Sequence, residues 1–142
     1  MTQPPTVGVV VVTHGQLANE LLNATEMIAG ELPHFEAVAL GWHDDPNAAK
    51  DQIAAAIGRV RREGGVLILT DMFGGTPSNL GITFLEEQQV EVVTGVNLPM
   101  LVKLANPDAQ PAGLLGVARQ VREHAREAIR VASDLMRPDS EM

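Results

Sequence analysis

A run of β-branched residues near the start of the chain limits the fold more than any other feature. Residues 7–13 read VGVVVVT, with no charged or amide side chain among them. A short, continuous apolar run is typical of a strand buried on both faces, as strands in parallel sheets are. Further strand candidates follow at residues 35–40, 66–70 and 90–93. The sequence therefore predicts four strands, with the first and the third fully buried.

Helical patterns separate these strands. Apolar residues recur at helical spacing from Leu17 onward, and Gly30 is typical of the end of such a helix. Asp45 stands directly before a proline, which predicts an N-cap followed by the first helical turn. Thr76 precedes a proline in the same way, and Pro99 predicts the start of one more short helix.

Strand and helix alternate four times, which predicts an α/β fold with a mainly parallel sheet. Right-handed crossovers place helices on both faces, so we expect a three-layer sandwich with the strand order 2-1-3-4. Near the end, apolar residues keep helical spacing from Leu114 to Ala125. The alternation that follows predicts an antiparallel edge strand over residues 128–133. No linker divides the chain, and we expect residues 1–142 to form a single domain.

The composition excludes several classes of protein. The chain has 10 basic and 18 acidic residues. The resulting net charge of −8 argues against binding to nucleic acid or to an anionic membrane surface. The absence of cysteine excludes disulfides, thiol catalysis and cysteine-ligated metal sites. No apolar stretch approaches the ~20 residues needed to span a bilayer. Residues 1–6 lack the basic charge of a signal peptide, so we expect a cytoplasmic protein.

Two polar residues follow buried strands, where α/β sheets carry their chemistry. His14 comes at the end of the first strand, and Asp71 comes directly after the third. Reactive groups gather at the carboxyl ends of parallel strands, and neighbouring strands would bring these two side chains together. A carboxylate that binds one imidazole nitrogen fixes the tautomer and leaves the other nitrogen free to attack. Each residue alone also fits an ordinary turn or cap, so the prediction depends on the pair.

A glycine-rich loop follows Asp71. Gly74 and Gly75 allow a ligand to approach the backbone closely, and the amides of Gly75 and Thr76 would point outward where the next helix begins. Amides beside a hydroxyl group are suited to binding an anion. A simple glycine turn before a capped helix also accounts for this pattern. Together with His14 and Asp71, the loop predicts a phosphorylatable histidine beside an oxyanion-binding loop.

Three segments resemble a known family. They are residues 12–15 (VTHG), residues 70–77 (TDMFGGTP) and residues 95–100 (GVNLPM). In this order they resemble the signature segments of the mannose-type enzyme IIA components of the bacterial phosphoenolpyruvate-dependent sugar phosphotransferase system. The similarity runs in order through residues 7–133, nearly the whole chain, and the three segments in combination are highly specific.

The resemblance implies a phosphotransferase component that forms a phosphohistidine and needs no cofactor. In the family, a histidine-containing phosphocarrier protein donates a phosphoryl group to the histidine that matches His14, and a IIB component accepts it. The family's aspartate matches Asp71 and its loop hydroxyl matches Thr76, while Gly74 and Gly75 complete the phosphate-binding loop. The family phosphorylates Nε2, which requires Nδ1 to face the aspartate. Together with the tail pattern, the resemblance suggests a homodimer that reaches the membrane only through its partners.

Two alternatives stay open at this point. Full-length transporters of the family often continue into a IIB domain, whereas this chain stops at Met142, which suggests a free-standing IIA component. A regulatory or non-catalytic interaction module of the same fold, which signals phosphorylation state without sugar transport, is therefore one alternative. The phosphoryl-donor subunit of dihydroxyacetone kinase is the other, because it shares the fold and the histidine. That family tends to lack the loop at residues 74–77.

The other histidines give weaker signals. His34 lies beside a proline and His124 lies on a charged helix, so we expect both to be solvated. His43 and Asp44 follow the second strand and could join His14 around a metal ion, but their spacing matches no known ligand set. Neither of the common nucleotide-binding glycine motifs occurs. We therefore expect neither a metal nor a nucleotide.

Overall fold

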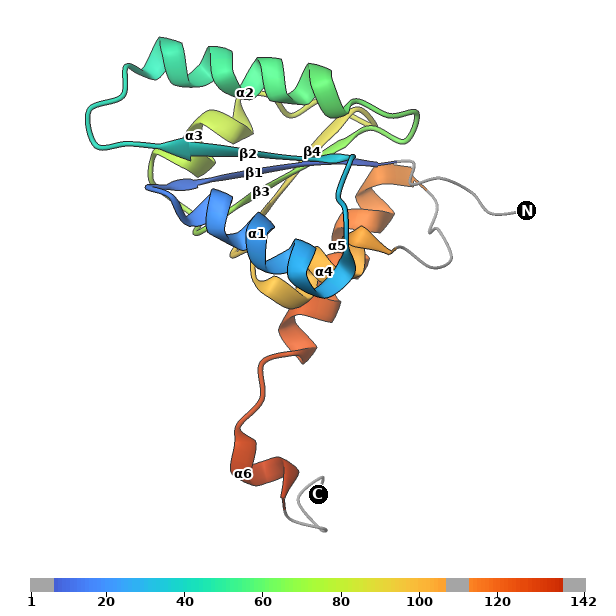
Figure 1. Cartoon of the computed structure of the whole chain (residues 1–142). Coiled ribbons are helices and arrows are strands. Elements are labelled where there is room, and N and C mark those ends of the chain that lie inside the picture. The colour runs from blue at the N-terminus through green and yellow to red at the C-terminus, as the bar shows by residue number, and fades with distance from the viewer. Residues whose placement is uncertain (1–6, 107–112, 137–142) are drawn as a thin grey trace.

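The computed structural model describes residues 7–106 and 113–136, which form an α/β fold around one parallel sheet (Figure 1). All four strands are parallel, and their order across the sheet is β2-β1-β3-β4. The predicted fold class and strand order are therefore confirmed. The strands are β1 (Gly8–His14), β2 (Phe35–Leu40), β3 (Val66–Thr70) and β4 (Val90–Thr94).

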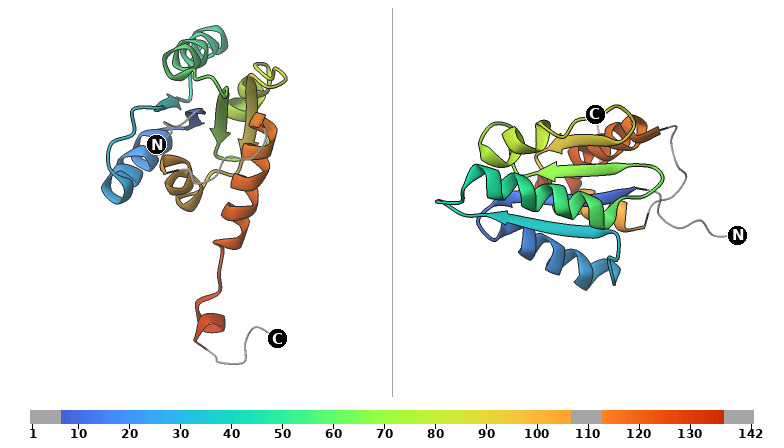
Figure 2. Two further views of the ribbon diagram at one scale, coloured as in Figure 1. Left: turned by 90° about the vertical axis from the view of Figure 1, so that its right-hand side faces the viewer. Right: turned by 90° about the horizontal axis from the view of Figure 1, so that it is seen from above.

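Helices cover both faces of the sheet, as the prediction of three layers requires. Helices α2 and α3 lie on one face, and α1, α4 and α5 lie on the other (Figures 1 and 2). No helix within the described residues is long and apolar enough to cross a bilayer. The helices are α1 (Leu17–Ala29), α2 (Pro46–Val60), α3 (Thr76–Ile82), α4 (Leu98–Ala105), α5 (Gly113–Glu127) and α6 (Ala132–Leu135).

The central strand β1 explains why its sequence is uniformly apolar. Val9 and Val11 contact the core beneath α1, α4 and α5, whereas Val10 and Val12 contact the core beneath α2 and α3. All four valine side chains are fully buried. Successive side chains of a strand point to opposite faces, so a strand covered by helices on both sides cannot alternate between apolar and polar residues.

Side-chain caps begin two of the helices, and the cap at Asp45 confirms the prediction. The Asp45 carboxylate accepts a hydrogen bond from the Ala48 amide at 3.0 Å and caps α2. Asn97 caps α4 by accepting from the Met100 amide at 3.1 Å. The prediction that Thr76 caps α3 is wrong. Gly75 is the N-cap and Thr76 is the first residue of α3, so the Thr76 hydroxyl makes no capping bond.

The predicted antiparallel strand over residues 128–133 is not formed in this chain. Helix α5 ends at Glu127, and the amides of Ala128 and Ile129 bond back to its last carbonyl groups rather than to a strand. The segment then runs away from the sheet into α6 (Figures 1 and 2). Among the described residues, this segment pairs with no strand of the sheet. Ile129 and Val131 are consequently 76% and 64% exposed.

The prediction that His34 is solvated is also wrong. His34 lies directly before β2 and is 2% exposed. Its ring packs edge-on against Phe35, with the ring centroids 4.7 Å apart, and its Nε2 lies 3.3 Å from the carbonyl oxygen of Leu104 at the end of α4. Burial lowers the pKa of His34, the bond to Leu104 opposes this shift, and the positive charge of Arg62 adds to it. The net effect keeps the ring neutral in the folded protein.

A neutral buried histidine makes the stability of the fold depend on pH. Because the folded pKa of His34 lies below the unfolded value of about 6.5, the unfolded chain binds the proton more readily. The free energy of unfolding should therefore fall as the pH drops below about 6.5. Urea unfolding at about pH 7.5 and about pH 5.5 measures this fall. His34→Gln, which keeps a donor for Leu104, should show a shallower fall, and an unchanged pH dependence in this variant would refute the assignment.

Candidate functional site

The sheet topology brings the two predicted reactive residues together. Strands β1 and β3 are neighbours, and Val12 lies opposite Thr70 in their register. His14 is the last residue of β1, and Asp71 directly follows β3. Both side chains therefore lie at the carboxyl edge of the sheet, where the strand order places ligands in folds of this kind.

Asp71 holds both the backbone and the ring of His14. One carboxylate oxygen, Oδ2, accepts a hydrogen bond from the His14 amide at 2.9 Å and lies 2.8 Å from His14 Nδ1. An ionised carboxylate can only accept, so the hydrogen of the neutral imidazole must be on Nδ1. The lone pair of the ring is then on Nε2. The His14 side chain is 53% exposed and that of Asp71 is 14% exposed, so the ring is accessible to solvent while the carboxylate that holds it is shielded.

Asp71 stays ionised although it is largely buried. Burial alone would raise the pKa of the Asp71 carboxyl group. The hydrogen bonds from the His14 amide and ring, with the attraction of the His14 ring, outweigh burial and hold the pKa below its ordinary value. The second carboxylate oxygen, Oδ1, is buried without a partner among the described residues. Both bonds to His14 therefore depend on a single oxygen atom.

The glycine loop lies against the free side of the imidazole. Gly75 has a φ of +92°, and a Cβ atom built on it would lie 3.2 Å from both Nε2 and Cε1 of His14. The amide of Gly74 donates to the Ser78 hydroxyl at 2.9 Å and is already used within the loop. Of the three predicted phosphate-binding residues, Gly75 and Thr76 thus have amides that make no helical hydrogen bond at the start of α3, whereas the Gly74 amide is occupied by Ser78. The occupied Gly74 amide could not be foreseen from the sequence.

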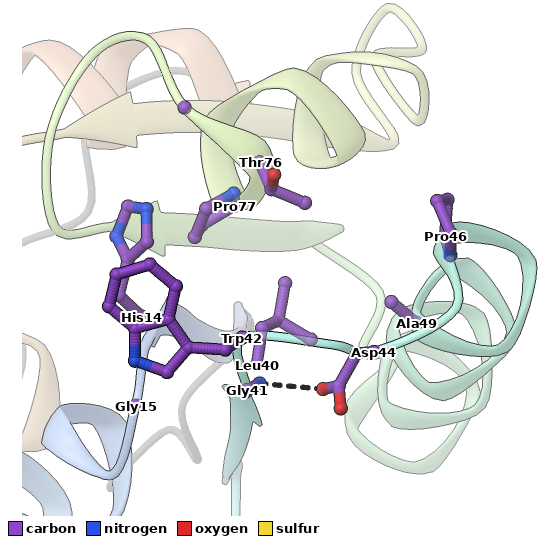
Figure 3. Close-up of a pocket in the computed structure, with 11 residues that line it drawn as sticks. His14, Gly15, Leu40, Gly41, Trp42, Asp44, Pro46, Ala49, Thr76 and Pro77 are labelled. Carbon is purple, nitrogen blue, oxygen red and sulfur yellow. Dashed lines mark hydrogen bonds between the residues drawn. The ribbon is translucent and has the colours of Figure 1, made fainter.

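A cavity of about 540 Å³ opens beside His14 (Figure 3). Apolar side chains of the β2–α2 segment and of α3 form much of its wall, and Trp42 lines it as well. Its lining residues are His14, Gly15, Leu40, Gly41, Trp42, Asp44, Pro46, Ala49, Gly75, Thr76 and Pro77.

The remaining histidines lie outside this cavity. His34 is buried at the opposite edge of the sheet, and His124 is exposed on α5, as predicted. His43 is exposed in the loop after β2 but does not line the cavity. Within residues 7–106 and 113–136, no three histidine, aspartate or glutamate side chains cluster as metal ligands would.

The fold and the site define a class of protein: an α/β domain with an aspartate-held histidine at the carboxyl edge of a parallel sheet in the order 2-1-3-4. Residues 8–113 match the family model described as the PTS system fructose IIA component, where PTS is the phosphotransferase system. The chain therefore belongs to this family of enzyme IIA components, and the resemblance found in its sequence is confirmed.

Relatives of this chain carry names from the same family. It is 34% identical over 98 residues to the PTS system sorbose-specific EIIA component of Lacticaseibacillus casei, a match that covers 68% of this chain and 70% of the relative. It is 31% identical to the PTS system fructose-specific EIIA component of Bacillus subtilis, over 69% of this chain and 68% of that one. The match to the mannose-specific EIIAB component of Escherichia coli is 33% identical and covers 69% of this chain but only 31% of the relative.

Solved structures agree with the fold. An EIIA component from Streptococcus agalactiae superposes with a TM-score of 0.79 at 22% identity, over 89% of this chain and 98% of that chain. The mannose/sorbose specific IIA subunit from Enterococcus faecalis superposes with a TM-score of 0.76 at 26% identity, over 89% and 94% of the two chains. At 22% identity, the similarity to the Streptococcus agalactiae structure supports the fold alone.

Proposed function

We propose that this chain is a phosphocarrier in which His14 receives a phosphoryl group from the histidine-containing phosphocarrier protein and passes it to a IIB component. The orientation of the His14 ring is the observation that supports this most directly. Asp71 binds Nδ1, which leaves the lone pair of Nε2 next to Gly75 and the cavity. A neutral imidazole with one nitrogen held and the other accessible is suited to nucleophilic attack on phosphorus.

In the proposed step, Nε2 of His14 attacks the phosphorus atom while the N–P bond to the donor's imidazole breaks. The electron pair of the broken bond returns to the donor ring. No proton has to leave His14, because its hydrogen stays on Nδ1. The ring gains positive charge as the new bond forms, and the Asp71 carboxylate beside it stabilises that charge. Transfer to the acceptor is the same step with the roles reversed.

The loop contributes to the proposed step through its backbone. The amides of Gly75 and Thr76 would bind the phosphoryl oxygens, and the Thr76 hydroxyl would add one further donor. Thr76 lines the cavity and is exposed, which supports this role. For Gly74, whose amide is bonded to Ser78, we propose a role in shaping the loop through its φ of +84°.

Gly75→Ala should slow phosphorylation of His14 by about 10²-fold, because an ångström-scale displacement of a reactive group has a cost of this order. The new Cβ would press on the imidazole at Nε2 and Cε1. Gly74→Ala is the matched control, since its φ is also positive but its Cβ would meet no atom within 4 Å. Initial rates of phosphate uptake compare the two variants. Equal losses in both would show that backbone strain, rather than contact with His14, causes the effect.

The name of the Escherichia coli relative supports a IIB component as the acceptor, because it joins an A and a B component in one protein. The proposal is tested by incubating this chain with labelled phosphoenolpyruvate and the two general phosphotransferase proteins. We expect one phosphate per chain in an acid-labile, base-stable bond. Addition of a IIB component should then remove it. A chain that is phosphorylated but passes nothing on would instead support the regulatory alternative.

We also propose that the chain forms a homodimer through its tail. Strand β4 is an edge of the sheet, and residues of β4 and α5 together line a groove of about 280 Å³ beside it. Residues 128–131 carry exposed Ile129 and Val131 in alternation. Pairing with the sheet edge of a second chain would cover both the unpaired edge and these side chains.

Sedimentation at micromolar concentration should therefore show a dimer of about twice the chain mass of 15.2 kDa. A chain truncated after Glu127, which keeps the whole of α5, should sediment as a monomer. A monomeric full-length chain would refute the dimer and leave the phosphocarrier proposal intact.

A further inference from the structure

The only tryptophan of the chain, Trp42, is exposed to solvent near His14. Trp42 is 98% exposed, although an indole is among the side chains that gain most from burial. It lines the same cavity as His14 and Thr76 (Figure 3). Because it is almost fully exposed, the indole contributes little to the stability of the fold.

The loop that carries Trp42 is fixed on both sides of the indole. The Gly41 amide donates to Asp44 Oδ2 at 2.6 Å, which closes the turn (Figure 3). Asp45 caps α2 by accepting from the Ala48 amide. These bonds hold the backbone on both sides of Trp42, so less backbone entropy is lost when a partner binds.

Other large apolar side chains are exposed at the same edge of the sheet. Leu17 follows β1 and is 45% exposed, while Met72 and Phe73 follow β3 and are 55% and 76% exposed. Together with Trp42, they place apolar surface after three of the four strands, at the carboxyl edge of the sheet where His14 lies. Apolar side chains gathered on a surface mark sites where proteins interact, and tryptophan is enriched among the residues that dominate binding energy.

We propose that Trp42 is the anchor on which the phosphoryl-donor protein docks, and that it determines how tightly that donor binds. The inference rests on the proposed function, since it assigns the donor to the face around His14. In-line transfer requires the donor's imidazole to approach Nε2 from the side opposite to the His14 ring. The cavity beside His14 has room for an imidazole ring, and the indole on its wall offers that ring an aromatic contact.

Charge favours a donor with a basic rim. Asp44 and Asp45 are exposed on the Trp42 loop, and the whole chain carries a net charge of −8. Opposite charges around an apolar centre steer a partner and fix its orientation more than they add affinity. The donor that this surface fits is therefore a protein with an apolar patch beside its histidine and basic side chains around it.

A nuclear magnetic resonance titration tests the contact without any phosphoryl transfer. One tryptophan gives one indole N–H signal in a ¹⁵N-labelled sample, so the signal of Trp42 needs no assignment. Unlabelled, unphosphorylated histidine-containing phosphocarrier protein is added to saturation. We expect the indole signal to move with the added donor, whereas a signal that stays in place at saturation would overturn the proposal.

Kinetics then separate docking from chemistry. Trp42→Ala should raise the KM for the phosphorylated donor by about tenfold and leave kcat within about twofold, because the indole binds the partner and touches no reacting atom. Trp42→Phe should recover part of the loss. Met27→Ala is the matched control, since Met27 is 88% exposed on α1 at the other edge of the sheet, and it should leave KM unchanged.

The outcomes distinguish this inference from the proposed function. If the unmodified chain takes no phosphoryl group from the donor, the proposed function fails, and the docking proposal fails with it. If it is phosphorylated but Trp42→Ala leaves KM unchanged, only the docking proposal fails. A loss confined to transfer from His14 to the IIB component would also overturn the assignment, because it would place Trp42 in contact with the acceptor.

Discussion

His14→Ala should abolish phosphorylation of the protein completely. The variant removes Nε2, for which no other described side chain substitutes: His43 does not line the cavity, His124 lies on α5, and His34 is buried at the opposite edge of the sheet. Labelled phosphoenolpyruvate with the two general phosphotransferase proteins should leave no acid-labile, base-stable phosphate on the variant. The effect is a loss of activity rather than of fold, because the His14 side chain is half-exposed.

Two matched variants show whether this loss is specific. His43→Ala and His124→Ala each remove an exposed histidine outside the site, and both should be phosphorylated as fast as the unmodified chain. Uptake of a full equivalent of phosphate by His14→Ala would place the phosphohistidine elsewhere. The mechanism proposed for this site would then be wrong.

Asp71→Asn should slow phosphorylation by at least about tenfold, and by less than the ~10⁴-fold that the corresponding change costs a serine-protease triad. Two His14 donors, the amide and Nδ1, bond to the same carboxylate oxygen. An asparagine can keep its oxygen at this position, but its amide nitrogen then takes the buried position of Oδ1, where no partner lies among the described residues. The variant also removes the charge that stabilises the ring during transfer.

The measurement that checks Asp71→Asn is the pre-steady-state rate of phosphate uptake, with thermal unfolding as the control for fold. A rate equal to that of the unmodified chain would show that the carboxylate charge plays no part. Asp71→Ala is the companion variant, since it removes the acceptor as well. It should be slower than Asp71→Asn, and the reverse order would contradict the role assigned to the hydrogen bonds.

The sheet could be predicted because its strands carry strong local signals. The valines of β1 are apolar at every position, which in a chain of this length is compatible only with burial on both faces. The boundaries of β2 and β3 match the predicted ranges, and β4 extends one residue further, to Thr94. The tail differs, since alternation over residues 128–131 signals a strand only where another strand is available to pair with it.

The pairing of His14 with Asp71 could be predicted because sequence order and the strand-end rule together fix where the two residues lie. His34 could not be placed in the same way. The proline before it is typical of a loop, and the residue that buries its ring nitrogen, Leu104, lies 70 positions further along the chain. The near-complete exposure of Trp42 could not be predicted either, because a single tryptophan after a strand carries no signal of exposure.

The central claim is that Nε2 of His14 carries the phosphoryl group, and long-range ¹H–¹⁵N correlation spectra of the phosphorylated, histidine-labelled protein test it most directly. The spectra distinguish Nδ1 from Nε2 in each of the four histidines. Since Asp71 binds Nδ1 of His14 at 2.8 Å, we expect the ¹⁵N shift of phosphorylation at Nε2 of this ring alone. Phosphorylation at Nδ1 of His14, or on any other histidine, would contradict the account.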